Sequence, residues 1–373
     1  MSEWKKVKLG DILQIKKGEY ITKKEAREGM YPVILGGREP AYYIDRYNHT
    51  GKAIVVSRSG ASAGYISFWN EPIFVTDGFL IEPKEKMSYE FLYYALKSKQ
   101  LLLHNAQKGA AIPHVTPFLI SDIDFLLPNE DSQHRIATIL SRYDSLIENY
   151  QKQIKLLEEA AQRLYKEWFV DLHFPGHENT KIVDGVPEGW KKKAISQLGE
   201  YLNGFAFKPS DWQESGKPII KIKEMGNGVG NDTPRNNGKR VPAKYLVKSG
   251  DLLFSWSATL MVIVWSGEEG WLNQHLFKVT PSKEIGREFL LQSISNTIEE
   301  FQNLTTGSTM KHIQRNKLDQ VFVNVPNDEI MESYSDIAEK SREQILHLSS
   351  QIRLLTEARD RLLPKLMSGE IIA

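Results

Sequence analysis

One segment, written twice, constrains this 373-residue chain more than any other feature. QIKLLEEAAQRLYKEWF begins at Gln153 and QIRLLTEARDRLLPKLM begins at Gln351, so the copies lie 198 residues apart with no gap between matched letters. Both copies are rich in Leu, Glu, Lys and Arg, residues that favour helix. The chain therefore has to accommodate one long helix in two copies.

The apolar residues in and upstream of each copy follow a heptad pattern. They are spaced alternately four and three residues apart, which is the period of a helix that packs along another helix. The second copy lapses at Ser341 and Arg359, and Pro364 is expected to end or kink it. The predicted N-caps are Asn129 or Asp131 in the first copy and Asn327 or Asp328 in the second.

A helix with a single apolar stripe needs a partner, and the other copy is the nearest candidate. We predict an antiparallel two-helix coiled coil, in which a helix from Ser132 to Phe169 would measure roughly 57 Å at about 1.5 Å per residue. The alternative is two separate helices, each packed on its own domain. The residues predicted to pair the helices are Ile136, Leu140, Tyr143, Ile147, Tyr150, Ile154, Leu157, Leu164, Ile345, Leu348, Ile352, Leu355 and Leu362.

The duplication extends over the whole chain. Ser57-Arg58-Ser59 matches Ser255-Trp256-Ser257 at the offset of 198, whereas Trp4 matches Trp190 at an offset of 186. A net insertion of 12 residues in the second copy explains the change. It falls in EMGNGVGNDTPRNNGKR, a Gly/Asn-rich stretch that predicts an exposed loop. The sequence is thus a tandem repeat of a globular unit followed by a long helix.

Each globular unit is predicted to be mixed α/β. Short apolar runs such as KAIVVS and DLLFSW indicate strands, while SYEFLYYALKSKQLLLH and GREFLLQSISNTIEEFQNL indicate helices. The predicted fold class is α+β, with two mixed α/β domains separated by the long helix pair. The predicted boundaries are 1–128 for the first domain, 129–172 for the first long helix, 173–186 for a linker, 187–326 for the second domain and 327–369 for the second long helix.

Composition excludes several classes of protein and site. The absence of cysteine excludes disulfides, thiolate metal sites and cysteine nucleophiles. The longest strongly apolar run, residues 260–265, is far shorter than the roughly 20 residues that cross a bilayer. The first residues also lack an apolar stretch of signal-peptide length. We therefore expect a cytoplasmic protein with no membrane partner.

The net charge of +1 conceals two basic regions. Residues 1–60 carry 12 Lys and Arg against 7 Asp and Glu, and residues 187–250 carry 12 against 6. Both helical regions are acidic. Two separated basic surfaces suit a protein that binds phosphates at two places, although uneven surface charge alone gives the same pattern.

Few residues indicate catalysis. The sequence contains no phosphate-binding loop, no dinucleotide fingerprint and no H-E-x-x-H zinc motif. Asp77 with Glu82 and Lys84 loosely resembles a nuclease metal site, but the second copy lacks these carboxylates. His114 and His312 recur at equivalent positions, where a hydrogen-bonded structural histidine is the simpler interpretation. We therefore expect neither a catalytic residue nor a bound metal.

Side chains suited to reading DNA crowd one stretch of each unit. In the major groove, Arg and Lys recognise guanine, and Asn and Gln recognise adenine. The two copies differ most in these stretches, as expected for two modules that read different sequences, although each residue alone is equally well an ordinary surface residue. The residues predicted to bind DNA are Arg38, Tyr42, Arg46, Asn48, Lys52, Ser57, Arg58, Ser59, Lys221, Lys223, Asn227, Asn231, Arg235, Asn236, Asn237, Lys239, Arg240, Ser255, Trp256 and Ser257.

A series of short motifs resembles the specificity subunit of a type I restriction-modification system, over essentially the whole chain. In order, the motifs are VPEGWKKK at Val186, PIIKIKEMGNG, KSGDLLFSWSA, LNQHLFKVTP, GSTMKHI and VPNDEI. The first copy departs from this pattern, since it opens SEWKKVKLGDI and has TGKAIVVSRSG in place of KSGDLLFSWSA. The resemblance implies a non-catalytic subunit whose two target recognition domains each read one half of a split DNA sequence.

The resemblance also implies partners. These are double-stranded DNA, two modification subunits that bind S-adenosylmethionine and methylate adenine, and a restriction subunit, with no cofactor in this chain. The long helices would set the gap between the half-sites and dock the modification subunits. Two further interpretations are a duplicated adaptor that holds two protein-binding heads, and a self-contained nuclease or methyltransferase, against which the missing motifs argue.

Overall fold

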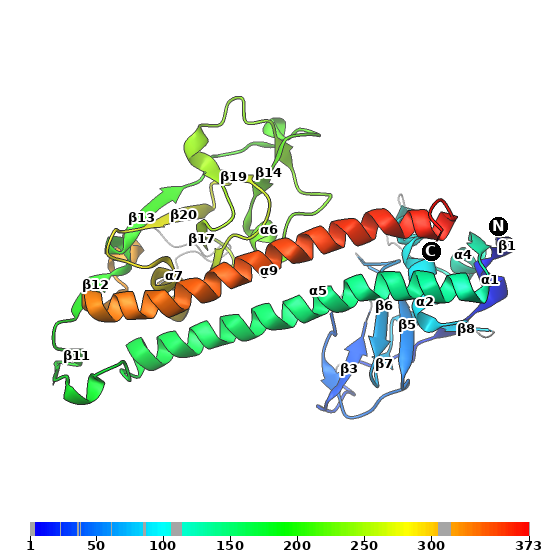
Figure 1. Cartoon of the computed structure of the whole chain (residues 1–373), viewed down its shortest axis with the longest axis horizontal. Helices are drawn as coiled ribbons and strands as arrows, with labels where there is room; N and C mark the ends of the chain where they lie inside the picture. Colours follow the sequence, from blue (N-terminus) through cyan, green and yellow to red (C-terminus); the bar gives the residue numbers. More distant parts are fainter. Residues whose placement is uncertain are drawn as a thin grey trace. The chain divides into compact units, whose positions relative to one another are not determined.

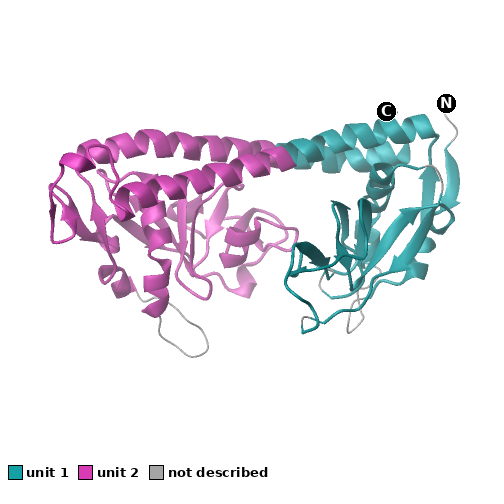
Figure 2. Ribbon diagram, turned by 90° about the horizontal axis from the view of Figure 1, so that it is seen from below, with its two compact units in different colours: residues 1–147, 354–373 teal, residues 148–353 magenta. Residues whose placement is uncertain are grey.

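The computed structural model describes residues 4–22, 24–35, 37, 39–60, 62–84, 87–105, 114–304 and 315–372. The chain divides into two compact units (Figure 2). Unit 1 comprises residues 1–147 and 354–373, and unit 2 comprises residues 148–353. Each unit therefore takes residues from both long helices.

Unit 1 is built on a four-stranded antiparallel sheet with the strand order β2-β8-β5-β6 (Figure 1). In β5 every residue after Lys52 is buried, because both faces of this strand are covered. Ile54 packs in the main core with Phe91 of α2, whereas Val55 belongs to a smaller core. The elements are β1 (Lys5–Lys8), α1 (Leu9–Ile12), β2 (Leu13–Lys17), β3 (Tyr31–Ile34), β4 (Tyr43–Ile44), β5 (Lys52–Ser57), β6 (Ile66–Asn70), β7 (Phe74–Val75), β8 (Gly78–Pro83), α2 (Tyr89–Lys97), α3 (Gln100–Asn105), α4 (Pro117–Ser121) and β9 (Asp124–Leu127).

Unit 2 repeats this plan with the antiparallel order β13-β20-β17-β18. A second sheet has the order β15-β14-β19-β16 and contains one parallel pair, β14 with β19. The elements are β10 (Ile182–Val183), β11 (Val186–Pro187), β12 (Lys191–Ala194), β13 (Gly199–Asn203), β14 (Lys217–Ile220), α6 (Ile222–Asn227), β15 (Arg235–Asn236), β16 (Leu246–Val247), β17 (Leu252–Ser255), β18 (Met261–Val264), β19 (Gly270–Leu272), β20 (Leu276–Pro281), α7 (Arg287–Asn296), α8 (Ile298–Asn303) and β21 (Phe322–Val325).

The strand registers confirm the internal duplication. Leu13 pairs with Pro83 in unit 1, and Gly199 pairs with Pro281 in unit 2, which reproduces the offsets of 186 and 198. Ile54 with Ile81 corresponds in the same way to Leu252 with Val279. The two units therefore share one scaffold, strand for strand and residue for residue along these ladders.

The two repeated segments are long helices. α5 spans Glu130–Tyr165, is continued by a π-helical turn over Lys166–Val170, and α9 spans Asp328–Ser368. Asn129 Oδ1 accepts a hydrogen bond from Ser132 N at 2.9 Å, and Asn327 Oδ1 accepts one from Ile330 N at 3.1 Å. The two asparagines are therefore the N-caps.

Within each unit, the helices pack against each other in antiparallel fashion. In unit 1, Ile136 and Leu140 of α5 share a core with Leu366 of α9. In unit 2, the ring of Tyr165 in α5 lies 6.4 Å from the ring of Tyr334 near the start of α9. The beginning of one helix thus meets the end of the other. The predicted pairing is confirmed, and the alternative in which each helix packs only on its own domain is wrong.

All thirteen residues predicted to pair the helices are buried or half-buried. Residues off the stripe are more exposed, with Leu156 at 65% and Leu146 at 44%. The lapse at Arg359 does not weaken the seam, because its guanidinium binds Asp144 of α5 across it.

Of the two outcomes expected at Pro364, an end to the helix does not occur. α9 continues to Ser368, because Leu366 and Met367 beyond the proline are buried in the core of unit 1. The expectation for the inserted stretch is wrong in detail. The stretch from Glu224 to Arg240 is not simply an exposed loop. It begins inside α6 and includes β15, and Glu224 is buried, where it accepts a hydrogen bond from Thr233 at 3.1 Å.

No helix in the described residues has an apolar stretch long enough to cross a membrane.

Candidate nucleic-acid interface

The insertion of unit 2 forms one wall of a cavity of about 460 Å³. Asn237, Lys239 and Arg240 line it, together with Gln213 and the rings of two phenylalanines. The rings of Phe205 and Phe207 pack edge to face, with centroids 4.9 Å apart. Among the described residues, neither Lys239 Nζ nor the Arg240 guanidinium has a hydrogen bond or ion pair. Three residues predicted to bind DNA therefore lie together on the wall of this cavity, beside two aromatic rings.

Asn236 also lines the cavity, and its side chain holds the loop in place. Its side chain is buried, with Nδ2 donating to Asp211 O at 2.7 Å and Oδ1 accepting from Gly238 N at 2.8 Å. A side chain at Gly238, whose φ is +76°, would collide with the ring of Trp271. Both ends of the Asn236 amide are therefore bonded inside the protein, and contact of this residue with bases stays a prediction.

The other cations of this stretch have partners. Arg235 donates to Gly216 O at 3.0 Å and pairs with Glu268 at 3.1 Å. Lys223 pairs with Asp232, whose carboxylate raises the pKa of the lysine. The structure also places three further predicted residues: Lys221 Nζ lies 4.5 Å from the centre of the Trp212 ring, and Asn227 and Asn231 are exposed. Arg235 and Lys223, whose charges are offset by carboxylates, therefore contribute less uncompensated positive charge than Lys239 and Arg240.

The predicted residues of unit 1 lie between the end of β3 and the segment just after β5. Arg46 lies over the ring of Phe74 at 5.7 Å and is about half exposed, while Lys52 forms an ion pair of 2.5 Å with Glu90. Tyr42 is half-buried against a small apolar core. Arg38 lies outside the described residues.

Asn48 in unit 1, like Asn236, is hydrogen-bonded inside the protein. Its Nδ2 donates to Val75 O at 2.9 Å, and its Oδ1 accepts from Val75 N at 2.8 Å. Both polar atoms of the side chain therefore bond to the backbone of Val75, the last residue of β7. The reading of a base by Asn48 stays a prediction.

The matched Ser-x-Ser segments follow equivalent strands, as predicted. Ser57, Ser255 and Ser257 are nevertheless buried, and Ser255 Oγ donates to Thr259 O at 2.7 Å. Their hydroxyls cannot serve DNA, which corrects the prediction for these three. Arg58, Ser59 and Trp256 are partly accessible, and they lie where the strands β5 and β17 end.

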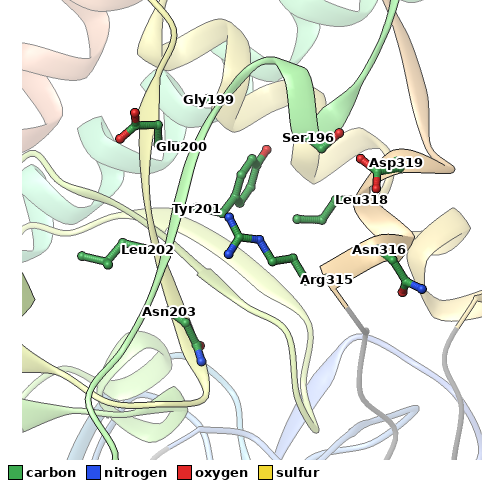
Figure 3. A pocket seen from close by; sticks show the side chains of 10 residues that line it. All are labelled: Ser196, Gly199, Glu200, Tyr201, Leu202, Asn203, Arg315, Asn316, Leu318 and Asp319. Atoms are coloured by element: carbon green, nitrogen blue, oxygen red, sulfur yellow. The ribbon is translucent and has the colours of Figure 1, made fainter.

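A larger cavity, of about 1060 Å³, lies against the edge strand β13 of unit 2 (Figure 3). Arg315 extends toward β13 from the short helix Arg315–Asp319, and no hydrogen bond or ion pair within the described residues holds it. Asn203 also lines the cavity, and its Oδ1 accepts a hydrogen bond from Trp256 Nε1 at 3.1 Å. Sequence reasoning missed Arg315 and Asn203, and no sequence pattern marked either of them.

The nuclease-like residues of unit 1 do not assemble into a site. Asp77 and Glu82 lie at opposite ends of β8. Glu82 pairs with Lys16 at 2.6 Å, and Lys84 Nζ donates to Gly10 O at 2.5 Å. Each polar group is therefore committed to a local contact. His114 lies 3.4 Å from Arg58, and His312 falls outside the described residues.

The family model of the type I restriction modification DNA specificity domain matches residues 1–159 and 187–349. The chain belongs to this family. Each matched segment holds one globular domain and the first part of one long helix. The duplication found in the sequence is therefore a tandem of two specificity domains.

The relatives are similar over nearly the full chain. The MjaIX specificity subunit, from a type I restriction enzyme of Methanocaldococcus jannaschii, is 25% identical over 86% of this chain and 78% of its own length. The MjaVIII specificity subunit of the same organism is also 25% identical, over 99% of this chain and 93% of its own length.

A solved structure has the same fold. The crystal structure of the type I restriction-modification S subunit from M. genitalium has a TM-score of 0.62 to this chain. The match covers 98% of this chain and 96% of the other, at 18% sequence identity.

Proposed function

We propose that this chain is the DNA-reading subunit of a type I restriction-modification complex. Unit 1 reads one half of a split target, unit 2 reads the other half, and the chain itself performs no chemistry. It directs two modification subunits, which carry S-adenosylmethionine, and a restriction subunit to the site. The predicted division into two recognition domains, a linker and two spacer helices belongs to this proposal.

The observation that carries the proposal is that the two units share one scaffold but present different surfaces. The sheets of the two units match register for register, whereas the loops that leave them differ in length and charge. A protein that binds one partner twice would repeat its surface together with its scaffold. A protein that reads two different half-sites has to change the surface and keep the scaffold.

The cavity of Lys239 and Arg240 supports nucleic acid as the ligand. Cations without an ion-pair partner bind phosphates. This electrostatic attraction gives most of the affinity for DNA, and the affinity therefore falls as the salt concentration rises. The adjacent side-chain amide nitrogens of Gln213 and Asn237 add donors that suit base edges, while their amide oxygens accept from Asn237 N and Lys239 N. A protein-binding adaptor has no need of this combination, so DNA is favoured over the alternative of a duplicated adaptor.

The helices support the roles of spacer and docking surface. α5 has 36 residues and α9 has 41, and each contributes to both units. Leu156, Ile337 and Leu354 lie on them with 48% to 65% of their surface exposed. Exposed leucines and isoleucines on a helix pair suit a partner protein better than water.

Binding of the full-length chain to a pool of random duplexes at low salt tests the proposal. We expect retention of DNA, and repeated selection should enrich a target with two defined halves and an undefined gap. Selection of a single continuous motif, or no retention at any salt concentration, would refute it. Incubation with S-adenosylmethionine or Mg²⁺ should leave the bound DNA unmodified and uncut, and any product would favour a self-contained enzyme.

The spacer role has its own test. Inserting one heptad near Gln151 of α5 and one near Ser350 of α9 lengthens both helices by about 10 Å, or about 3 base pairs. We expect the selected gap to grow while both half-sites stay the same. A changed half-site with an unchanged gap would contradict the spacer role.

A further inference from the structure

The four-stranded sheet of each unit ends in the same way at one edge, which we call the sheet tip. In unit 1 the tip consists of Lys17, Arg58 and Asp77, and in unit 2 of Asn203, Trp256 and His275. Lys17 pairs with Phe79 in the sheet of unit 1, and Asn203 pairs with Phe277 in the sheet of unit 2. The two tips are therefore equivalent in strand register as well as in sequence alignment.

The backbone of the sheet tip is the same in both units. Arg58 N donates to Asp77 O at 3.3 Å, and Trp256 N donates to His275 O at 3.4 Å. The glycines that follow Lys17 and Asn203 each donate to β8 or β20 at 3.0 Å. A side chain on either glycine would collide with a neighbouring backbone oxygen, at 2.5 Å in unit 1 and 2.1 Å in unit 2. The frame is therefore fixed while the side chains on it are free to differ.

The side chains of the two tips differ in chemistry. In unit 1, Arg58 Nη1 lies 3.7 Å from Asp77 Oδ1, and the other carboxylate oxygen accepts a hydrogen bond from Ser59. In unit 2, Trp256 and His275 lie ring to ring, with centroids 5.6 Å apart, and Trp256 is bonded to Asn203. A charged pair has thus been replaced by neutral aromatic groups at the same place.

We propose that the sheet tip is the base-reading position of each unit, and that Arg58, held in place by Asp77, reads a guanine in the half-site of unit 1. The inference rests on the proposed function, since it requires each unit to bind DNA. Arginine donates two hydrogen bonds to O6 and N7 of guanine, the commonest specific contact in the major groove. The neutral tip of unit 2 lacks this fork and selects a different base.

The charge balance argues for a base and against a phosphate as the ligand of Arg58. Asp77 offsets its charge, and the carboxylate at 3.7 Å, together with His114 Nε2 at 3.4 Å, holds the guanidinium at a strand end with about a third of the side chain exposed. Phosphate contacts need net charge and tolerate mobility, whereas base contacts need a fixed direction. Lys17, which is exposed and has no side-chain partner within the described residues, is the better phosphate ligand of this tip.

The experiment is selection from a random duplex pool by the full-length chain at one salt concentration. Arg58→Ala should lower the preference for guanine at one position of one half-site by about tenfold to a hundredfold, leaving the other half-site unchanged. Asp77→Asn should act at the same position with a smaller effect, because it positions Arg58 and does not touch the base. Trp256→Ala should alter only the other half-site.

Controls separate this inference from folding and from the proposed function. Arg58→Lys retains a cation beside Asp77 but lacks the planar fork, so it should fold normally and keep a weaker guanine preference than the unmodified chain. Equal weakening on all sequences, with a salt slope reduced by about one, would make Arg58 a phosphate ligand and overturn the inference. An unchanged consensus would overturn it as well. Failure of the unmodified chain to bind any duplex would instead refute the proposed function.

Discussion

Asp144 of α5 forms an ion pair with Arg359 of α9, with 2.5 Å between Oδ1 and Nη1, inside unit 1. Only about a fifth of each side chain is exposed. The other oxygen of Asp144 accepts a hydrogen bond of 2.6 Å from Tyr94 of α2. One carboxylate therefore connects both long helices to the globular part of unit 1. Burial, reinforced by this carboxylate, raises the pKa of Tyr94.

Asp144→Ala should destabilise unit 1 by about 1–3 kcal/mol, because it leaves the buried hydroxyl of Tyr94 without an acceptor and removes the partner of Arg359 on the other helix, while Asp360 still accepts from that guanidinium. Urea unfolding of the full-length chain measures this. The matched control is Arg361→Ala, which removes an exposed pair with Glu357 and should change stability by less than about 0.5 kcal/mol. The double variant Asp144→Leu with Arg359→Leu should be more stable than Asp144→Ala, and an equal loss would contradict this account.

Arg342 occupies in α9 the position that Asp144 occupies in α5, with the charge reversed. It binds Glu288 of α7 through two hydrogen bonds, of 2.8 and 3.1 Å, and these side chains are 6% and 1% exposed. Glu288→Gln should cost about 3–5 kcal/mol in unit 2 because it leaves Arg342 buried and uncompensated. Unfolding followed by the tryptophans of unit 2 should show the loss, and a shift confined to unit 1 would speak against it.

Leu156→Ala separates a docking role from a structural one. This side chain is 65% exposed, so its loss should change stability by less than about 0.5 kcal/mol while weakening association with the modification subunit. Leu366→Ala is the opposite case, since a leucine 1% exposed should cost about 2–5 kcal/mol. Titration of the modification subunit against the Leu156→Ala and Leu366→Ala variants measures the association of each. Undiminished association of the Leu156 variant would remove this residue from the docking surface.

Unit 2 should lose stability in alkali between about pH 10 and pH 12. Burial raises the pKa of Tyr165 to about 12, above the value of about 10 for an unfolded tyrosine. The folded state therefore keeps its proton where the unfolded state loses it, so the contribution is complete below pH 10 and disappears as the pH rises. Urea unfolding at pH 8, 10 and 11 should show a shallower decline for Tyr165→Phe. The matched control is Tyr150→Phe, and equal declines in both variants would exclude Tyr165 as the source.

Arg240→Ala and Lys239→Ala should each weaken DNA binding and lower the salt slope by about one, because each cation is exposed without a partner among the described residues. Lys223→Ala should have a smaller effect, since Asp232 already neutralises that lysine. Arg235→Ala falls in the same weaker class because of its pair with Glu268. Affinities between about 50 and 200 mM salt distinguish the classes, and equal slopes for Arg240→Ala and Lys223→Ala would count against the assigned interface.

The scaffold was predictable because it is periodic. The spacing of apolar residues, alternately four and three positions apart, identified both long helices and the stripe along which they pair. The offset of 198 between the copies identified the repeated sheets. Arg359 looked like a flaw because a heptad pattern registers apolarity alone. Its carboxylate partner is 215 residues away, and only the antiparallel register brings the two together.

The site was less predictable because residue type does not reveal what a side chain already binds. Asn48 and Asn236 have the amides that adenine readers need, yet both close loops inside the protein. Ser255 is completely buried. Arg315 escaped notice because its access to a cavity arises only when β13 and the short helix meet.

The composition of unit 1 has a consequence for biosynthesis. Leu363, Leu366 and Met367 complete a core whose other members lie between Leu9 and Leu140. A ribosome that has made the whole first head still holds an unfinished domain, with an apolar patch awaiting a helix that is more than two hundred residues from being translated. Unit 2, drawn from residues 148–353, is released complete before that helix end emerges. The first head to be synthesised is therefore the last to mature, and translation that stops before residue 363 leaves it permanently open.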